Sequence, residues 1–147
     1  MGDCWFEDLD IGATAVSRPY DVAEEEIIAF ARQFDPRPFH VDRDAAAASI
    51  FGGITASSAH IFSIATRLTI ELAPWFRVLA AMGFDETRFP NPVRPNDRLV
   101  FTIRVDNKRI SQSRTDRGIV HCIGTLCNHK HEIVMERGAT LLVARRP

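Results

Sequence analysis

The stretch FGGITASSAHIFSIATRLTIEL, residues 51–72, decides the fold because it predicts one long helix that is apolar enough to be buried. A glycine pair precedes a helix start near Ser57 or Ser58, and Pro74 closes the segment. Apolar residues recur at three- and four-residue steps, and Phe62 widens their stripe: Ile61, Ile64, Ala65, Leu68 and Leu72. We expect this segment to be the most buried helix of the domain.

After NPVRPND, residues 91–97, the apolar pattern changes to a period of two, which is typical of strands. Leu99–Val105 alternates in this way, and Ile119–Leu126 and Ile133–Val143 are two further predicted strands. The polar turn CNHKHE joins the last two, which indicates an antiparallel sheet. Residues 13–17 add a candidate strand near the N-terminus. A buried helix clasped by this sheet is the architecture that we expect.

A helix is also predicted near the N-terminus. Asp21 is expected at its N-cap, with Glu24 completing a capping box. The helix is expected to end at Asp35, because Pro36 disfavours the helical conformation in the residue before it. Helices before a run of strands give an α+β order, and with no linker or repeat the chain is predicted to be a single domain, residues 1–147. The apolar face of this helix is predicted to contain Ile27, Ile28, Ala31 and Phe34.

The composition is that of an ordinary globular chain, with 147 residues, 46% hydrophobic and 25% charged. Eighteen basic and nineteen acidic side chains leave a net charge of -1, which gives no strong field to attract nucleic acid or an anionic membrane. No apolar run approaches the roughly 18 residues that span a bilayer, and no signal peptide is predicted at the acidic N-terminus. Three cysteines make no disulfide framework, so a cytoplasmic location with free thiols is expected: Cys4, Cys122 and Cys127.

The segment DPRPFH, residues 35–40, places an acid and a histidine at the two ends of a rigid loop. Both prolines fix φ, so the loop loses less entropy on ordering and holds its side chains in set directions. If the loop folds back, Asp35 and His40 converge, and a carboxylate beside an imidazole is an acid–base couple near neutral pH. An aspartate at a helix end and a histidine in a proline-rich loop are also common without any function, so the segment alone does not decide.

The segment FGGITASSAH, residues 51–60, is a second candidate, because it leaves free N–H groups at the positive end of the buried helix. Such an end binds a phosphate or a developing oxyanion. The simpler interpretation is that Ser57 or Ser58 only caps the helix.

Four blocks in order, FDPRPFHVD, FGGITASSAH, NPVRPNDRL and SRTDRGIV, resemble the successive blocks of the MaoC-like dehydratases. That family includes the (R)-specific enoyl-CoA hydratases of the hydratase 2 type. The resemblance extends from about Phe6 to Arg145, and its first block matches the hydratase pattern of Asp, two residues, Pro, one residue, His. It implies a hot-dog fold, in which an antiparallel sheet wraps a long central helix. It also implies a homodimer, or a higher oligomer, with sites at the subunit interface.

By this resemblance, Asp35 and His40 are the catalytic pair and the backbone N–H of Ser58 binds the thioester oxygen. The implied activity is that of a lyase of fatty acid metabolism, an enoyl-CoA hydratase. It adds water reversibly and syn to a trans-2-enoyl-CoA, which gives a (3R)-hydroxyacyl-CoA. The small-molecule partner is then an acyl-CoA substrate, with no metal or redox cofactor and no nucleic acid or membrane partner. No motif specifies the acyl chain or the pathway.

Three positions depart from the usual pattern of the family. Ser57-Ser58 stands where members tend to have Ser-Gly or His-Gly; the N–H is kept, but a serine Cβ narrows the space for the thioester. Arg37 stands where hydratases often carry Asn. Asn96 replaces the glycine of a frequent Arg-Pro-Gly-Asp turn, which Asn serves because it tolerates positive φ.

Two other functions stay open. A thioesterase on the same fold commonly places a carboxylate on the central helix, and Glu71, near its far end, is the only acid on the predicted helix. A non-catalytic acyl-CoA-binding or assembly subunit is the other alternative, since Ser58 replaces the usual glycine.

Several further residues are weaker candidates. Ser57 and His60 are expected to support the site from behind, and His60 is also a candidate to line the acyl pocket. Basic residues in and around the loops of the sheet are candidates for contacts to the CoA phosphates, although solvated loop charge explains them equally well: Arg94, Arg98, Lys108 and Arg109, with Arg114 and Arg117 nearby.

The other histidines and the aromatic residues are more readily explained by structure. His129 and His131 form a candidate metal pair, but a predicted turn without a third ligand favours solvated residues, and no metal site is predicted. His121 is expected to be a packed or edge histidine in a strand. Four aromatic residues either bound an acyl tunnel or belong to the core: Phe62, Trp75, Phe76 and Phe84.

Overall fold

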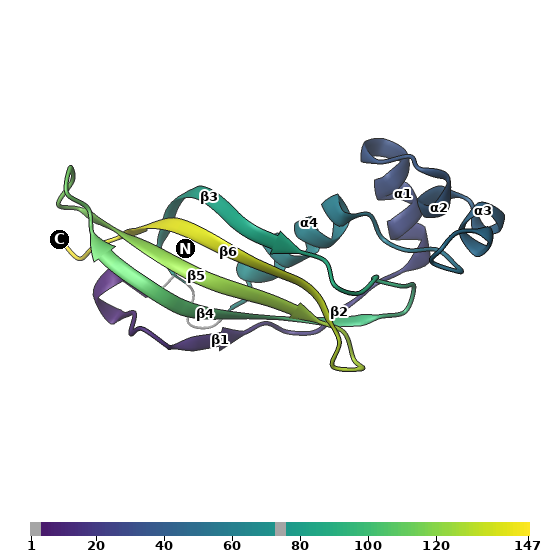
Figure 1. Ribbon diagram of the computed structural model, residues 1–147. Helices are drawn as coiled ribbons and strands as arrows, with labels where there is room; N and C mark the ends of the chain where they lie inside the picture. Colours follow the sequence, from purple (N-terminus) through teal and green to yellow (C-terminus); the bar gives the residue numbers. More distant parts are fainter. Residues whose placement is uncertain (1–3, 73–75) are drawn as a thin grey trace.

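The computed structural model describes residues 4–72 and 76–147, and Figure 1 shows how their elements are arranged. The helices are η1 (Phe6–Asp8), α1 (Glu24–Phe34), α2 (Pro38–Val41), α3 (Arg43–Ala48) and α4 (Ser58–Thr69). The strands are β1 (Thr14–Val16), β2 (Tyr20–Asp21), β3 (Val78–Arg88), β4 (Arg98–Ile110), β5 (Arg117–Cys127) and β6 (Ile133–Ala144). The main helices precede the long strands, which confirms the α+β prediction.

The strands form a six-stranded antiparallel sheet in the order β1-β4-β5-β6-β3, and β2 pairs with β4. Side chains along β5 alternate between buried and half-buried, as the pleat of a strand requires. The three long predicted strands are confirmed as β4, β5 and β6, and residues 13–17 contain β1. Each long strand extends beyond its predicted bounds, because backbone pairing continues past the apolar residues.

Helix α4 packs its apolar face against the sheet, as predicted (Figure 1). Ser57 caps the helix, because its Oγ accepts from the N–H of His60. The helix ends at Thr69, earlier than predicted; Leu72 is buried beyond it, and Pro74 lies outside the described residues. Four side chains of α4 join one apolar core with the inner face of the sheet: Ile61, Ile64, Ala65 and Leu68.

Helix α1 begins later than predicted, so the predicted capping box is wrong. Asp21 lies in β2, opposite Arg98 of β4, and the N–H of Val22 donates to the carbonyl oxygen of Asp97. This strand pairing keeps Asp21 extended, so Ala23 occupies the N-cap position without a side-chain hydrogen bond.

The buried face of α1 is also shorter than predicted. Ile27 and Ala31 are buried and Ile28 is partly buried, but Phe34 is 62% exposed. Phe34 lies in the last turn and packs on Phe30, with ring centroids 4.9 Å apart, rather than on the core. The predicted end of the helix is confirmed, since Asp35 is the C-cap.

Strand β3 was not predicted, because nearly all of its side chains are exposed and no alternation marks it. It pairs with β6 and forms an edge of the sheet. Three of its apolar side chains are exposed: Leu79, Met82 and Phe84. The short helices α2 and α3 were missed as well, because four and six residues are too few to show a helical period.

Two further observations concern the chain as a whole. The three cysteines carry free thiols, as predicted. Within the described ranges, every helix falls short of the length and apolar character that a membrane crossing requires.

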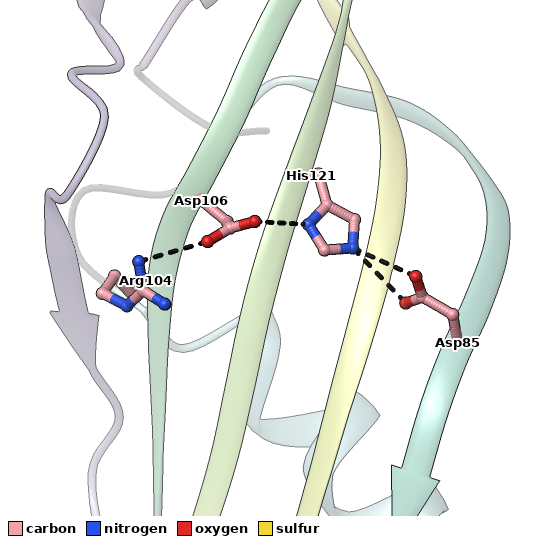
Figure 2. Close-up of polar contacts among 4 residues, drawn as sticks. All are labelled: Asp85, Arg104, Asp106 and His121. Atoms are coloured by element: carbon pink, nitrogen blue, oxygen red, sulfur yellow. Dashed lines mark hydrogen bonds and ion pairs between the residues drawn. The ribbon is translucent and has the colours of Figure 1, made fainter.

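His121 of β5 lies between two carboxylates on the face of the sheet opposite α4 (Figure 2). Its Nδ1 is 3.1 Å from Asp106 Oδ2 of β4, and its Nε2 is 3.3 Å from Asp85 Oδ2 of β3. Gly138 of β6 leaves room for the second contact, because a Cβ there would collide with the Asp85 carboxylate. Partial burial by itself lowers the pKa of His121, but the hydrogen bonds and charges of both carboxylates outweigh it and raise the pKa. Protonated His121 therefore ties the edge strand β3 to the centre of the sheet.

We expect His121→Gln to lower the Tm by about 2–4 °C at mildly acidic pH and much less at alkaline pH. The raised pKa of the folded state means that the stabilisation is complete below the ordinary value of 6.5 and is lost as the pH rises through the raised value. Thermal unfolding of both proteins from about pH 5.5 to about pH 8.5 measures the difference. Asp106→Asn serves as the matched variant and should show the same pH dependence. A difference in Tm that does not change with pH contradicts this role of His121.

Candidate active site

The loop between α1 and α2 brings Asp35 and His40 to one place. Asp35 follows α1 in a non-helical conformation, with φ of -153° and ψ of 71°, and Pro38 opens the four-residue helix α2. The N–H of Arg37 donates to the carbonyl oxygen of Asp35 at 2.8 Å, which closes the bend. As a result, Asp35 Oδ2 lies 3.7 Å from His40 Nε2. The two ends of DPRPFH therefore converge, as expected for a loop that folds back.

The imidazole of His40 is held through its second ring nitrogen. Nδ1 lies 2.6 Å from the backbone carbonyl oxygen of Thr55, and the side chain is 6% exposed. A carbonyl oxygen only accepts, so Nδ1 carries the hydrogen and Nε2 is turned towards Asp35. The separation of 3.7 Å between Nε2 and Oδ2 is too long for a direct hydrogen bond, and one water molecule can bond to both groups.

Asp35 and His40 line a cavity of about 310 Å³ at the start of α4. Its volume is within the range of small-molecule pockets. The helix contributes Ser58 and Ile61 to the wall. The other lining residues are Arg37, Phe39, Phe51, Thr55, Ala56, Phe89, Pro90, Asn91 and Pro92.

The backbone N–H of Ser58 has no acceptor among the described residues. Ser58 is the first residue of α4, and N–H groups in the first turn of a helix lack intrahelical acceptors. Ser57 accepts from two later N–H groups of the helix, through Oγ from His60 and through its carbonyl oxygen from Ile61. The helix dipole adds partial positive charge at this end. The cavity therefore combines a carboxylate, an imidazole and an N–H suited to an oxyanion.

Arg37 forms an ion pair with Asp35, and one guanidinium nitrogen lies 2.8 Å from both carboxylate oxygens. The Arg37 side chain is 63% exposed, whereas that of Asp35 is 17% exposed. An ion pair with so exposed a partner contributes little to stability. Its structural effect is to fix the direction of the Asp35 carboxylate beside His40. This contact is what Arg37 adds at a position where hydratases often carry Asn.

Two parts of the cavity could not be predicted from the sequence. Thr55 orients His40 through a backbone carbonyl, and its own Oγ1 is buried without a partner among the described residues. The segment Phe89–Pro92 forms a wall, and Asn91 Nδ2 holds it by donating to the carbonyl oxygen of Ile133 at 2.8 Å. A contact made by a backbone carbonyl leaves no pattern in the sequence. For the wall segment, the two prolines on either side of Asn91 are the sequence signal of a rigid loop.

Ser57 and His60 lie behind the cavity and do not line it. His60 Nε2 is 2.9 Å from Glu26 Oε1, and the ring stacks on Phe30 with centroids 4.5 Å apart. Tyr20 donates to the same Glu26 oxygen at 2.5 Å, and burial together with this bond raises the pKa of Tyr20 to about 12. These contacts join α1 to α4, so they fix the start of the helix that lines the cavity.

The basic candidates are not brought together within one chain. Arg94 donates to two backbone carbonyls of the glycine-containing loop before α4 and lies near the cavity. Arg98 pairs with Asp21 at 3.7 Å. Lys108 and Arg109 lie towards the other end of β4, roughly 33 Å from Arg98 at the rise of an extended strand.

The other sequence candidates lie away from the cavity. His129 and His131 are in the turn between β5 and β6, where His129 Nδ1 accepts from the N–H of Arg98 at 3.3 Å. In the part of the chain that the structure describes, no three His, Cys, Asp or Glu side chains are grouped to hold a metal ion. Glu71 lies beyond the end of α4 and pairs with Arg67 at 2.8 Å. Asn96 has a φ of 68°, as predicted for its turn.

The four aromatic candidates separate into two groups. Phe76 is buried in the core, and Trp75 lies outside the described residues. Phe62 and Phe84 pack edge to face, with ring centroids 4.9 Å apart. Phe62 belongs to the first half of α4 and Phe84 to β3, and neither lines the cavity that contains Asp35.

A long antiparallel sheet packed on a central helix defines the hot-dog fold, and solved structures share it. A MaoC-like dehydratase from Rhodospirillum rubrum superimposes with a TM-score of 0.92 and 39% identity, covering 98% of this chain and 99% of that one. The R-hydratase PhaJ1 from Pseudomonas aeruginosa has a TM-score of 0.79 and 20% identity, with 97% and 86% covered, a likeness that shows the fold alone.

The family is shown by the sequence itself. The model of the MaoC like domain matches residues 10–123, and the chain belongs to this family. The uncharacterized protein YdeM from Bacillus subtilis (strain 168) is 29% identical over 140 residues, which cover 95% of this chain and 98% of that protein. Membership confirms the resemblance seen in the four sequence blocks and implies dehydratase or hydratase chemistry.

Proposed function

We propose that the protein is an enoyl-CoA hydratase, which adds water reversibly and syn to a trans-2-enoyl-CoA to give a (3R)-hydroxyacyl-CoA. The observation that carries the proposal is the 3.7 Å separation of Asp35 Oδ2 and His40 Nε2 in one cavity with the N–H of Ser58, which has no acceptor in the described part of the chain. Family membership supports the class of reaction, and the (R)-hydratases among the solved structures share the fold.

In the proposed mechanism, Asp35 and His40 hold one water molecule between them. Asp35 accepts a proton as the water oxygen attacks C3, and the electrons of the C2–C3 double bond move towards the thioester. Negative charge then grows on the thioester oxygen, where the Ser58 N–H and the helix dipole stabilise it. His40 orients the water by accepting a hydrogen bond from it at Nε2, and the pair then passes the proton held by Asp35 on to C2, so that both groups end as they began. Because both groups lie on one side of the substrate, the addition is syn.

We also propose that the protein acts as a homodimer. Strand β3 is an edge strand of 11 residues, and among the described strands it pairs with β6 alone. It exposes unpaired backbone groups together with three large apolar side chains, a combination that marks a protein interface. These side chains are Leu79, Met82 and Phe84. Sedimentation equilibrium should therefore give twice the mass of the chain.

Mixing the protein with crotonyl-CoA tests the proposed reaction. Hydration predicts loss of the enoyl absorbance without release of a free thiol. A thioesterase releases the thiol, and a non-catalytic acyl-CoA binder gives neither signal; either result contradicts the proposal. The reverse reaction, started from (3R)-hydroxybutyryl-CoA, should restore the absorbance, and the (3S) isomer is the control that should not.

A further inference from the structure

Arg137 is a charged residue on the apolar face of strand β6. Odd-numbered residues of β6 point towards α4, and Arg137 lies among Met135 and Ala139, which are buried. Arg137 itself is only 3% exposed. A guanidinium is rarely buried to this extent unless an anion accompanies it.

The guanidinium has no carboxylate partner among the described residues. One nitrogen donates to Thr66 Oγ1 at 3.0 Å, and the group lies over the rings of Phe62 and Phe84, at 4.3 and 4.8 Å from their centroids. Burial lowers the pKa of Arg137 to about 10, so the group is still charged at neutral pH. Aromatic faces attract a cation, but they do not replace the hydrogen-bond acceptors that it loses on leaving water.

This side chain lines a second cavity, of about 150 Å³, between α4 and the sheet. Arg137 is the only charged residue among those that line it. The other lining residues are Thr66, Thr69, Val78, Ala81, Phe84, Phe101, Ile103, Gly124, Ala139 and Leu141. An apolar cavity with one unpaired cation in its wall is suited to an apolar chain that ends in an anion.

The second cavity lies further along α4 than the site at Ser58. Ser58 lines the first cavity and Thr66 the second, eight residues further along the helix. Eight residues correspond to about 12 Å along the helix axis and to a rotation of roughly 80° round it. Phe62 lies between them, about 40° round the helix from each. An extended chain advances about 3.5 Å for every three bonds, so roughly ten bonds connect the two positions.

We propose that Arg137 binds a carboxylate at the far end of the acyl chain, so that the preferred substrates are trans-2-enoyl-CoA esters of dicarboxylic acids of medium length. The inference rests on the proposed hydratase activity and names its substrate class. The carboxylate forms paired hydrogen bonds with the guanidinium and supplies the missing counter-charge. The rings of Phe62 and Phe84 then cover the methylene groups beside it.

The experiment compares two trans-2-enoyl-CoA substrates of equal length, about ten carbons, one ending in a carboxylate and the other in a methyl group. For the unmodified protein we expect kcat/KM to be at least tenfold higher with the carboxylate. Arg137→Gln should lower kcat/KM for the carboxylate substrate by about 10–100-fold, because a hydrogen-bonded charge is lost. Arg137→Lys, which keeps the charge without the paired geometry, should give an intermediate value.

The outcomes separate this inference from the function on which it rests. If the protein hydrates neither ten-carbon substrate and does not hydrate crotonyl-CoA, the proposed function is overturned, and this inference is overturned with it. If kcat/KM of the unmodified protein for the methyl-ended substrate equals or exceeds that for the carboxylate substrate, this inference alone is overturned. That result is expected if an acidic side chain of a second copy pairs with Arg137. Far-ultraviolet circular dichroism checks that Arg137→Gln is folded. If that variant is not folded, the inference is tested by the substrate preference of the unmodified protein and by kcat/KM of Arg137→Lys.

Discussion

Asp35→Asn and His40→Gln are each expected to lower kcat for enoyl-CoA hydration by about 10²–10⁴-fold, the contribution of a positioned acid or base. The asparagine keeps the shape of Asp35 but cannot accept the proton of water. The glutamine cannot reproduce the imidazole, which is oriented by Thr55 at 2.6 Å. Both effects should fall on kcat, because the water and the transition state are bound between these two groups.

The double variant provides the sharper test of the pair. Two groups that hold one water act as a unit, so Asp35→Asn combined with His40→Gln should be little slower than the worse single variant. Asp44→Asn is the matched control, since it makes the same substitution at an exposed aspartate of α3 outside the cavity. Near-normal hydration by both folded single variants contradicts the assignment of Asp35 and His40.

Ser58→Pro is expected to lower kcat by about 10²–10³-fold, the usual cost of removing one donor from an oxyanion hole. Proline deletes the N–H that the mechanism requires. The substitution should leave α4 intact, because Ser58 is the first helical residue, where proline is favoured. The preceding Ser57, with φ of -66° and ψ of 154°, already has the extended conformation that a following proline requires.

Ser58→Ala is the control for this substitution, because it removes the hydroxyl and keeps the N–H. It should hydrate at close to the normal rate, and Ser58→Gly should do so as well. If Ser58→Pro is folded and has the kcat of the unmodified protein, the thioester oxygen is bound elsewhere. If Ser58→Ala is as slow as Ser58→Pro, the hydroxyl rather than the N–H is the active group.

The elements that the sequence predicted correctly are those with a regular apolar period. Helix α4 is recognised because four of its apolar residues share one face, and β5 because its apolar residues alternate. The error at Asp21 arose where a long-range interaction outweighed a local one, since pairing with Arg98 of β4 kept that residue extended. Strand β3 is not predicted from the sequence, because an edge strand whose side chains are exposed on both faces shows no alternation of apolar residues.

The candidate site was predictable in part for a related reason. Asp35 and His40 are joined by a short rigid loop, so their convergence depends on local structure. The orientation of His40 depends on the carbonyl of Thr55, which only the folded chain brings near. Arg137 falls within the predicted strand Ile133–Val143, and the sequence alone does not show whether a carboxylate lies near its charge. The basic residues are close in the sequence, yet Arg98 and Lys108 lie towards opposite ends of β4.

The central claim is that Asp35 and His40 deliver one water molecule to C3 of an enoyl thioester and a proton to C2 from the same side. The most direct test is to hydrate crotonyl-CoA in deuterium oxide enriched in heavy oxygen. The product is then analysed by mass spectrometry, and its stereochemistry is determined. We predict (3R)-hydroxybutyryl-CoA with the heavy oxygen on C3 and one deuterium on C2, added syn. Heavy oxygen in a released carboxylic acid, a (3S) product, or anti addition would contradict the claim.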